Sequence, residues 1–414
     1  MKNRVYYGEY SLKHWIDLML SGNIVLPEYQ REFVWKTRDI KRLIKSLKSG
    51  QFIMPVTIAQ YAPNGEEPRN LLLDGQQRLS SILLAWLGYE PDKSKFEESD
   101  GFASEDDSAK EENPVQQNSH KAIAWRFQEV VKFKKRKKED IIQEIEKDGR
   151  YDKLTDIELT DDILDNTFLG FSYIVPDSKE KDDIQNNFSQ LFRNINYFGK
   201  KLSSLESRKS LYYMNAELKN FFEGKTARNE ECFGNIKIME DTVAKQIDFV
   251  RFLAILSQQH SGATPLVGYS AYSSRESFYA DYVSYILGIE QEDKDDKFNK
   301  FKFEETFPEN CWITRYDNLL VALTTLRPNM QLNDKNAFVS WIDADYWLFG
   351  LIYHIVFEGK VLNDDVSELC NRIKSQIKKK KSEYSKTPNQ LGHTRERVKE
   401  SIDIYENHVH VPAL

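Results

Sequence analysis

Residues 74 to 78, Asp-Gly-Gln-Gln-Arg, bring a carboxylate, two carboxamides and a guanidinium into one turn. The apolar run Leu71–Leu73 before them predicts a buried strand, and the residues after them predict a helix. A strand-to-helix turn presents backbone N–H groups and the positive end of the helix dipole, which suits phosphate. Arg78 adds a forked, permanently charged donor at the same place. The helix is indicated by apolar residues at helical spacing: Leu79, Ile82, Leu83 and Trp86.

The same residues also fit a purely structural interpretation. Asp74 is a good N-cap, and Gln77, three residues later, could close a capping box with it. Gly75 would then serve only the turn. Spacing alone therefore leaves the choice between a helix cap and a phosphate site open.

The elements around the turn indicate a mixed α/β core. A helix is expected between Thr37 and Gly50, because apolar residues repeat there at helical spacing. The β-branched run Val56–Ile58 and the segment Phe168–Val175 predict strands. We therefore expect the fold class α+β, with this core at the N-terminus and a mainly helical domain after it.

Three segments together resemble the N-terminal domain family of GmrSD-type restriction endonucleases. They are Leu26–Trp35, the Asp74–Arg78 motif and Phe192–Glu206, and they occur in the family's order. The resemblance covers residues 1–215 and implies a small core related to the ParB and sulfiredoxin fold. Many relatives carry a separate C-terminal nuclease of His-Asn-His type. We expect that module to be missing here, because His408-Val409-His410 leaves no room for its metal-binding helix.

The resemblance also implies a site and its ligands. Catalytic roles fall on Asp74, Gln77 and Arg78, and Asp74 would hold Mg²⁺ or another divalent cation. The ligand or substrate would be a nucleoside triphosphate. The residues implied to bind its phosphates are Arg31, Gly75, Gln76, Arg78 and Asn196.

Three functions remain open on this basis. The first is a prokaryotic defence protein of restriction type that binds and hydrolyses a nucleoside triphosphate, coupled to recognition or cleavage of foreign DNA. The second is a non-enzymatic sensor of nucleotide or DNA that gates a partner nuclease or effector. The third is a direct metal-dependent nuclease, which ranks lower because few carboxylates lie near the motif. The enzyme class, NTP hydrolase or nuclease, is therefore left undecided.

Charge is distributed unevenly along the chain. The net charge of −7 argues against a surface that binds nucleic acid everywhere. An acidic insert at about residues 91–120 is expected to be mobile. A basic run nearby could contact DNA phosphates without reading sequence. Its cationic residues are Lys132, Lys134, Lys135, Arg136, Lys137 and Lys138.

The second half of the chain predicts helices. Apolar segments at Ile247–Leu256, Phe278–Ile289 and Tyr346–Phe357 are long enough for core helices. We therefore divide the chain into a GmrSD N-terminal-type domain at 1–215 and a helical domain at 216–414.

Several classes are excluded by what the sequence lacks. It has no P-loop, no dinucleotide fingerprint and no zinc motif. No apolar run reaches the ~20 residues that span a membrane, and the start of the chain is not a signal peptide. Three scattered cysteines suit a reducing compartment. We expect a cytoplasmic protein without membrane contact.

Overall fold

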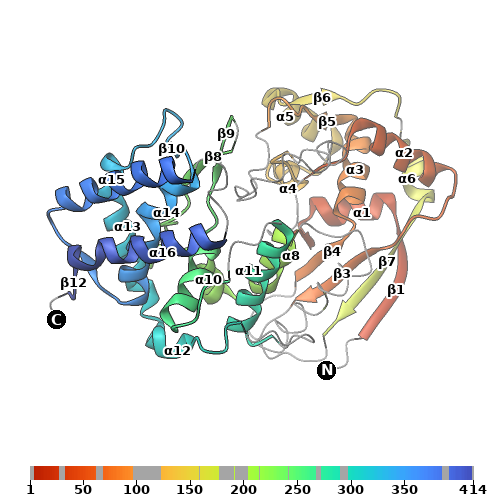
Figure 1. The fold of residues 1–414 in the computed structure, drawn as a ribbon. Helices are drawn as coiled ribbons and strands as arrows, with labels where there is room; N and C mark the ends of the chain where they lie inside the picture. Colours follow the sequence, from red (N-terminus) through yellow and green to blue (C-terminus); the bar gives the residue numbers. More distant parts are fainter. Residues whose placement is uncertain are drawn as a thin grey trace. The chain divides into compact units, whose positions relative to one another are not determined.

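A computed structural model of the 414-residue chain describes twelve stretches of it: 4–27, 33–61, 69–96, 123–157, 159–176, 191, 204–213, 215–240, 242–266, 272–289, 297–384 and 391–412. The described part divides into two units, with the boundary between Ser210 and Leu211 (Figure 1). Residues 97–122, which hold most of the expected acidic insert, lie outside the described residues. Pro91 and Phe96, at the start of that insert, belong to the first unit, where both are buried.

A five-stranded mixed sheet forms the centre of the first unit. In spatial order its strands are β1 (Arg4–Ser11), β7 (Phe168–Val175), β3 (Val56–Tyr61), β4 (Arg69–Asp74) and β2 (Ile24–Val25). The pairs β1–β7 and β3–β4 are antiparallel, and the pairs β7–β3 and β4–β2 are parallel. A separate antiparallel pair joins β5 (Tyr89–Pro91) to β6 (Tyr151–Lys153).

Helices cover one face of this sheet, as Figure 1 shows. They are α1 (Leu12–Leu20), α2 (Thr37–Lys48), α3 (Gln76–Leu87) and α6 (Asp161–Asn166). Two further helices pack on these elements: α4 (Gln128–Val131) contacts α1, and α5 (Lys138–Asp148) contacts α3 and β6. The apolar stripe of α2 and the stripe of α3 meet Ile58 and Leu72 of the sheet in one core. This burial of apolar surface, worth ~25 cal/mol per Å², is what holds the end of β4 and the start of α3 in place.

The second unit is mainly helical. Its helices and 3-10 or π turns are α9 (Ala216–Glu223), α10 (Phe249–His260), α11 (Tyr272–Ile286), α12 (Phe303–Thr306), η2 (Pro308–Asn310), α13 (Trp312–Leu326), η3 (Arg327–Asn329), α14 (Trp341–Ile352), η4 (Tyr353–Phe357), α15 (Ser367–Glu383), α16 (Leu391–Tyr405) and η5 (Glu406–His408), and α8 (Ser204–Tyr212) spans the boundary. Its strands are β8 (Lys237–Glu240), β9 (Val243–Gln246), β10 (Ala337–Phe338), β11 (Val361–Leu362) and β12 (Val409–His410).

Helix α14 is the central element of the second unit. All twelve of its residues are buried, and it packs against α10, α13, α15 and α16. A helix that is buried on every side must be surrounded by other elements. The expected fold class, an α+β core followed by a mainly helical region, is confirmed. Among the described helices, none combines the length and hydropathy needed to cross a bilayer.

Candidate functional site

The Asp-Gly-Gln-Gln-Arg motif lies where β4 ends and α3 begins. Asp74 is the last residue of the strand, Gly75 is the N-cap, and the helix starts at Gln76. Gly75 has a φ of +99°, which L-residues rarely adopt. The N–H of Leu79 donates to the carbonyl of Gly75 at 2.9 Å, the first hydrogen bond of the helix. The motif is therefore a sharp turn from a buried strand into a buried helix.

The capping box predicted as the structural alternative is wrong. Asp74 lies one position before the N-cap, and the N-cap makes no side-chain hydrogen bond. The side-chain oxygen of Gln77 points elsewhere: it accepts from the N–H of Val34 at 3.0 Å and from that of Trp35 at 3.4 Å. Gln77 thus ties the start of α3 to a loop more than forty residues earlier in the chain.

Asp74 and Arg78 form an ion pair across the first turn. Nη2 of Arg78 lies 2.5 Å from Oδ2 of Asp74. The same guanidinium donates to the carbonyl of Met54 at 2.9 Å and to that of Pro55 at 3.4 Å. The Arg78 side chain is 13% exposed, whereas that of Asp74 is 45% exposed. The arginine is therefore anchored from three sides, and the carboxylate faces solvent.

Gln76 is buried beside this pair. Its side chain is 5% exposed, and its Nε2 has no hydrogen-bond partner within the described part of the chain. A buried amide donor without a partner costs about 1–3 kcal/mol. This amide is therefore available to donate to water or to a ligand.

Two hydroxyl groups next to the motif gave no signal in the sequence. Thr57 of β3 lies opposite Asp74 in the strand register, at an irregularity between Thr57 and Ile58. The hydroxyl of Ser172 on β7 donates to that of Thr57 at 3.0 Å. The pairing joins strands more than a hundred residues apart, so no local pattern could have revealed it.

Two of the implied phosphate-binding residues come from outside the motif. Arg31 and Asn196 lie outside the described residues. In the described ranges, no group of three or more His, Cys, Asp or Glu side chains could hold a metal ion. Among the described residues, Asp74 is therefore a single carboxylate rather than a member of an acidic cluster.

The basic run forms the loop from the end of α4 to the start of α5. Lys132 pairs with Glu129 at 2.6 Å, and the ammonium of Lys138 lies 5.9 Å from the centre of the Trp86 ring. The four cationic residues between them are exposed and form no ion pair with any described residue: Lys134, Lys135, Arg136 and Lys137. Apart from its two ends, this run is open to an anionic partner.

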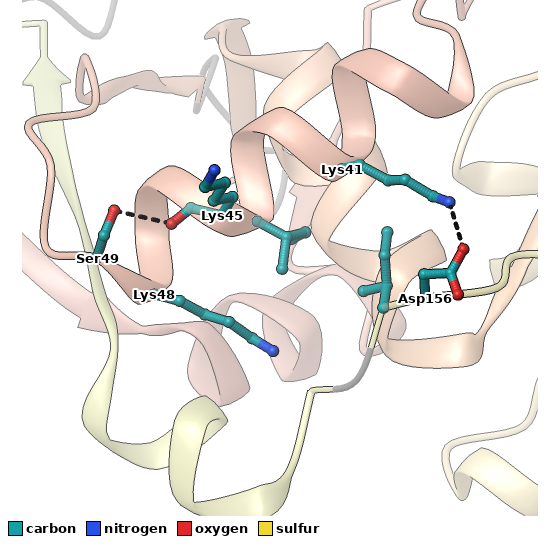
Figure 2. Close-up of a pocket in the computed structure, with 7 residues that line it drawn as sticks. Lys41, Lys45, Lys48, Ser49 and Asp156 are labelled. Atoms are coloured by element: carbon teal, nitrogen blue, oxygen red, sulfur yellow. Dashed lines mark hydrogen bonds and ion pairs between the residues drawn. The ribbon is translucent and has the colours of Figure 1, made fainter.

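A second basic feature lies along α2, and the sequence analysis did not single it out. A cavity of about 460 Å³ opens beside the helix (Figure 2). We call it the basic groove, and its lining residues are Lys41, Ile44, Lys45, Lys48, Ser49, Asp156 and Ile157. The signal was present in the sequence: lysines repeat every three to four residues along α2, beside its apolar stripe.

Comparison with known proteins defines the class of the first unit. The family model of the GmrSD restriction endonuclease N-terminal domain matches residues 12–213. This segment therefore carries a domain of this restriction-type family, and it contains four of the five strands of the sheet, the Asp74–Arg78 turn and the basic groove.

One curated relative shares a shorter segment. The uncharacterized protein MJ0686 of Methanocaldococcus jannaschii is 35% identical over 96 residues, which is 18% of this chain and 17% of that protein. The chain thus spans under a fifth of the relative's length, and the likeness is confined to that segment.

Proposed function

We propose that the first unit is the nucleotide-hydrolysing module of a restriction-type defence protein that acts on foreign DNA in the cytoplasm. The Asp74–Arg78 pair is the observation that carries this proposal. It presents a carboxylate and a guanidinium side by side, at the end of a strand and the start of a helix. A Mg²⁺–phosphate unit has the complementary arrangement, with its cation for Asp74 and its anion for Arg78.

The donor set fits Mg²⁺ rather than a metal held by the protein alone. Mg²⁺ is commonly bound through one or two carboxylates together with substrate phosphates and water. Asp74 supplies one carboxylate, 45% exposed, and no acidic cluster stands beside it in the described residues. When bound, the ion would neutralise charge on the phosphates. The same scarcity of carboxylates disfavours cleavage of DNA by two metal ions at this turn.

The other motif residues receive supporting roles. The amino end of α3 adds the positive end of its dipole near the phosphates. Gln77 acts as a positioning residue, because its oxygen already holds the backbone of Val34 and Trp35. Gln76 offers a buried donor that has no described partner. DNA would contact the exposed cations of the 132–138 loop through its phosphates.

Phosphate release from GTP and ATP with Mg²⁺, measured with and without DNA, tests the proposal. We expect Asp74→Asn and Arg78→Ala each to lower kcat by about 100-fold or more, the usual loss for a group that stabilises transferred charge. Asp403→Asn and Arg372→Ala are matched controls, because both side chains are exposed on helices of the second unit. Melting temperatures show whether the variants fold.

The outcomes separate the three candidate functions. If Asp74→Asn and Arg78→Ala both hydrolyse nucleotide at the wild-type rate, the turn is not the hydrolytic site. Nucleotide binding without turnover would favour a sensor that gates a partner nuclease or effector. Plasmid cleavage with metal but without nucleotide would favour a direct nuclease.

A further inference from the structure

Helix α2 has two chemically opposed faces. Ile40, Leu43, Ile44 and Leu47 are buried in the core of the first unit. The rest of the helix carries five basic residues and one acidic residue, Asp39. Asp39 is engaged at the helix start, where it accepts from the backbone N–H of Lys36 at 3.1 Å. The outward face is therefore strongly cationic in a chain whose net charge is −7.

The basic groove concentrates this charge. Three ammonium groups and one carboxylate line it, and Figure 2 shows the lysines along α2 with Asp156 on the facing segment. Nζ of Lys41 lies 3.1 Å from Asp156, whose side chain is 81% exposed. The hydroxyl of Ser49 is already used, because it donates to the carbonyl of Lys45 at 2.9 Å. An anionic ligand would therefore bind the groove through electrostatic attraction to the lysine ammonium groups.

We propose that the basic groove binds the phosphate backbone of duplex DNA, an inference that rests on the DNA coupling in the proposed function. From Lys41 to Lys48 the helix rises about 10 Å at 1.5 Å per residue, close to the rise of three base pairs along the duplex axis at about 3.4 Å each. An acidic peptide is the competing occupant. It is an outcome of the test, because Ile157 of the groove is half-buried and offers a peptide some apolar surface.

The test uses the full chain and a fluorescent 30-base-pair duplex, titrated at several salt concentrations. Replacement of Lys41, Lys45 and Lys48 by Gln should weaken DNA binding by about tenfold or more. The slope of log K against log salt concentration should become shallower by about 0.9 for each phosphate contact that is lost. The same change at Lys374, Lys378 and Lys379 on α15 is the charge-matched control and should leave both quantities close to wild type.

A second variant tests the groove in the opposite direction. Asp156→Asn removes the carboxylate that pairs with Lys41, so it should tighten DNA binding several-fold. Asparagine tolerates the positive φ of 63° at this position. A loss of folding would lower affinity, so a gain cannot arise from damage to the protein.

The results distinguish this inference from the proposed function. Unchanged hydrolysis without DNA, together with weaker DNA binding of the lysine variant, would support the groove. An affinity and a salt slope equal to those of the control would overturn it, as would a wild-type chain that does not bind the duplex. Binding of a poly-glutamate peptide in place of DNA would overturn it in favour of an acidic protein partner.

Discussion

At the scale of single residues, Gly75 decides whether the turn can form. Its φ of +99° already disfavours any side chain. A Cβ at this position would also lie 2.3 Å from Cγ1 of Val56 and 3.2 Å from Nη2 of Arg78. The glycine is therefore required both by backbone conformation and by the close approach of β3 and Arg78.

Gly75→Ala should lower the free energy of unfolding by about 2–5 kcal/mol. This is the sum of ~1–2 kcal/mol for a left-handed residue and ~1–3 kcal/mol for overpacking. Gly88→Ala, at the other end of α3, is the control, because it has a φ of +77° but nothing within 4 Å of the added carbon. It should lose only the conformational part. Equal losses in urea unfolding of the two variants would contradict the crowding argument.

The sequence could identify the motif but not the partners of its residues. The strand-to-helix turn and its glycine follow from local pattern. The partners of Gln77 at Val34 and Trp35, and of Arg78 at Met54 and Pro55, come from separate loops. Only the folded sheet brings these groups together, so a capping box remained an equal alternative until the structure excluded it.

At the scale of elements, periodicity predicted the spans well and the termini less well. The expected strand at Phe168–Val175 has those bounds, and α2 ends before Gly50 as expected. Its N-cap is Lys36 rather than Thr37, whose hydroxyl instead donates to Glu90 at 2.7 Å. The strand order could not be predicted, because β1 pairs with a strand some 160 residues later.

One buried carboxylate on helix α14 joins it to two other helices of the second unit. Asp345 is fully buried. Its Oδ1 lies 2.8 Å from Nη1 of Arg251 on α10, and its Oδ2 lies 2.8 Å from Nε of Arg397 on α16. The guanidinium of Arg251 also lies 4.6 Å from the centre of the Trp341 ring. This carboxylate thus forms an internal ion-pair network with two arginines.

Asp345→Asn should destabilise the second unit by about 3–5 kcal/mol, because it removes the carboxylate from two buried guanidinium groups. Urea unfolding followed by tryptophan fluorescence measures the loss. Asp403→Asn, at an exposed position of α16, should stay within about 0.5 kcal/mol of wild type. A small effect at Asp345 would show that the arginines find other acceptors.

At the scale of the whole molecule, the negative net charge does not show that cationic residues are concentrated in two places. The chain is acidic overall, yet cations gather on α2 and in the 132–138 loop. Composition correctly argued against a uniformly basic surface, but it could not show which lysines share one groove. That required Ile157 and Asp156 to fold back against a helix more than a hundred residues earlier.

The dependence of stability on pH should reflect a network that connects α14, α15 and α16. Burial pushes the pKa of Glu400 upward, but hydrogen bonds from Tyr346, Gln376 and Lys380 outweigh it, so the pKa lies below its ordinary value of 4.5. A carboxyl whose pKa is lower in the folded state stabilises the fold above its unfolded pKa. That stability is lost as the pH falls through the folded pKa.

Unfolding free energies measured from pH 7 down to pH 3 should therefore decline below about pH 4.5, with Glu400 as one contributor. Glu400→Gln should lower stability at pH 7 and make the acid decline shallower, because the amide cannot titrate. Glu368→Gln is the control, since that side chain is exposed at the start of α15. The network at Glu400 would not govern acid stability if both variants followed the wild-type curve in parallel.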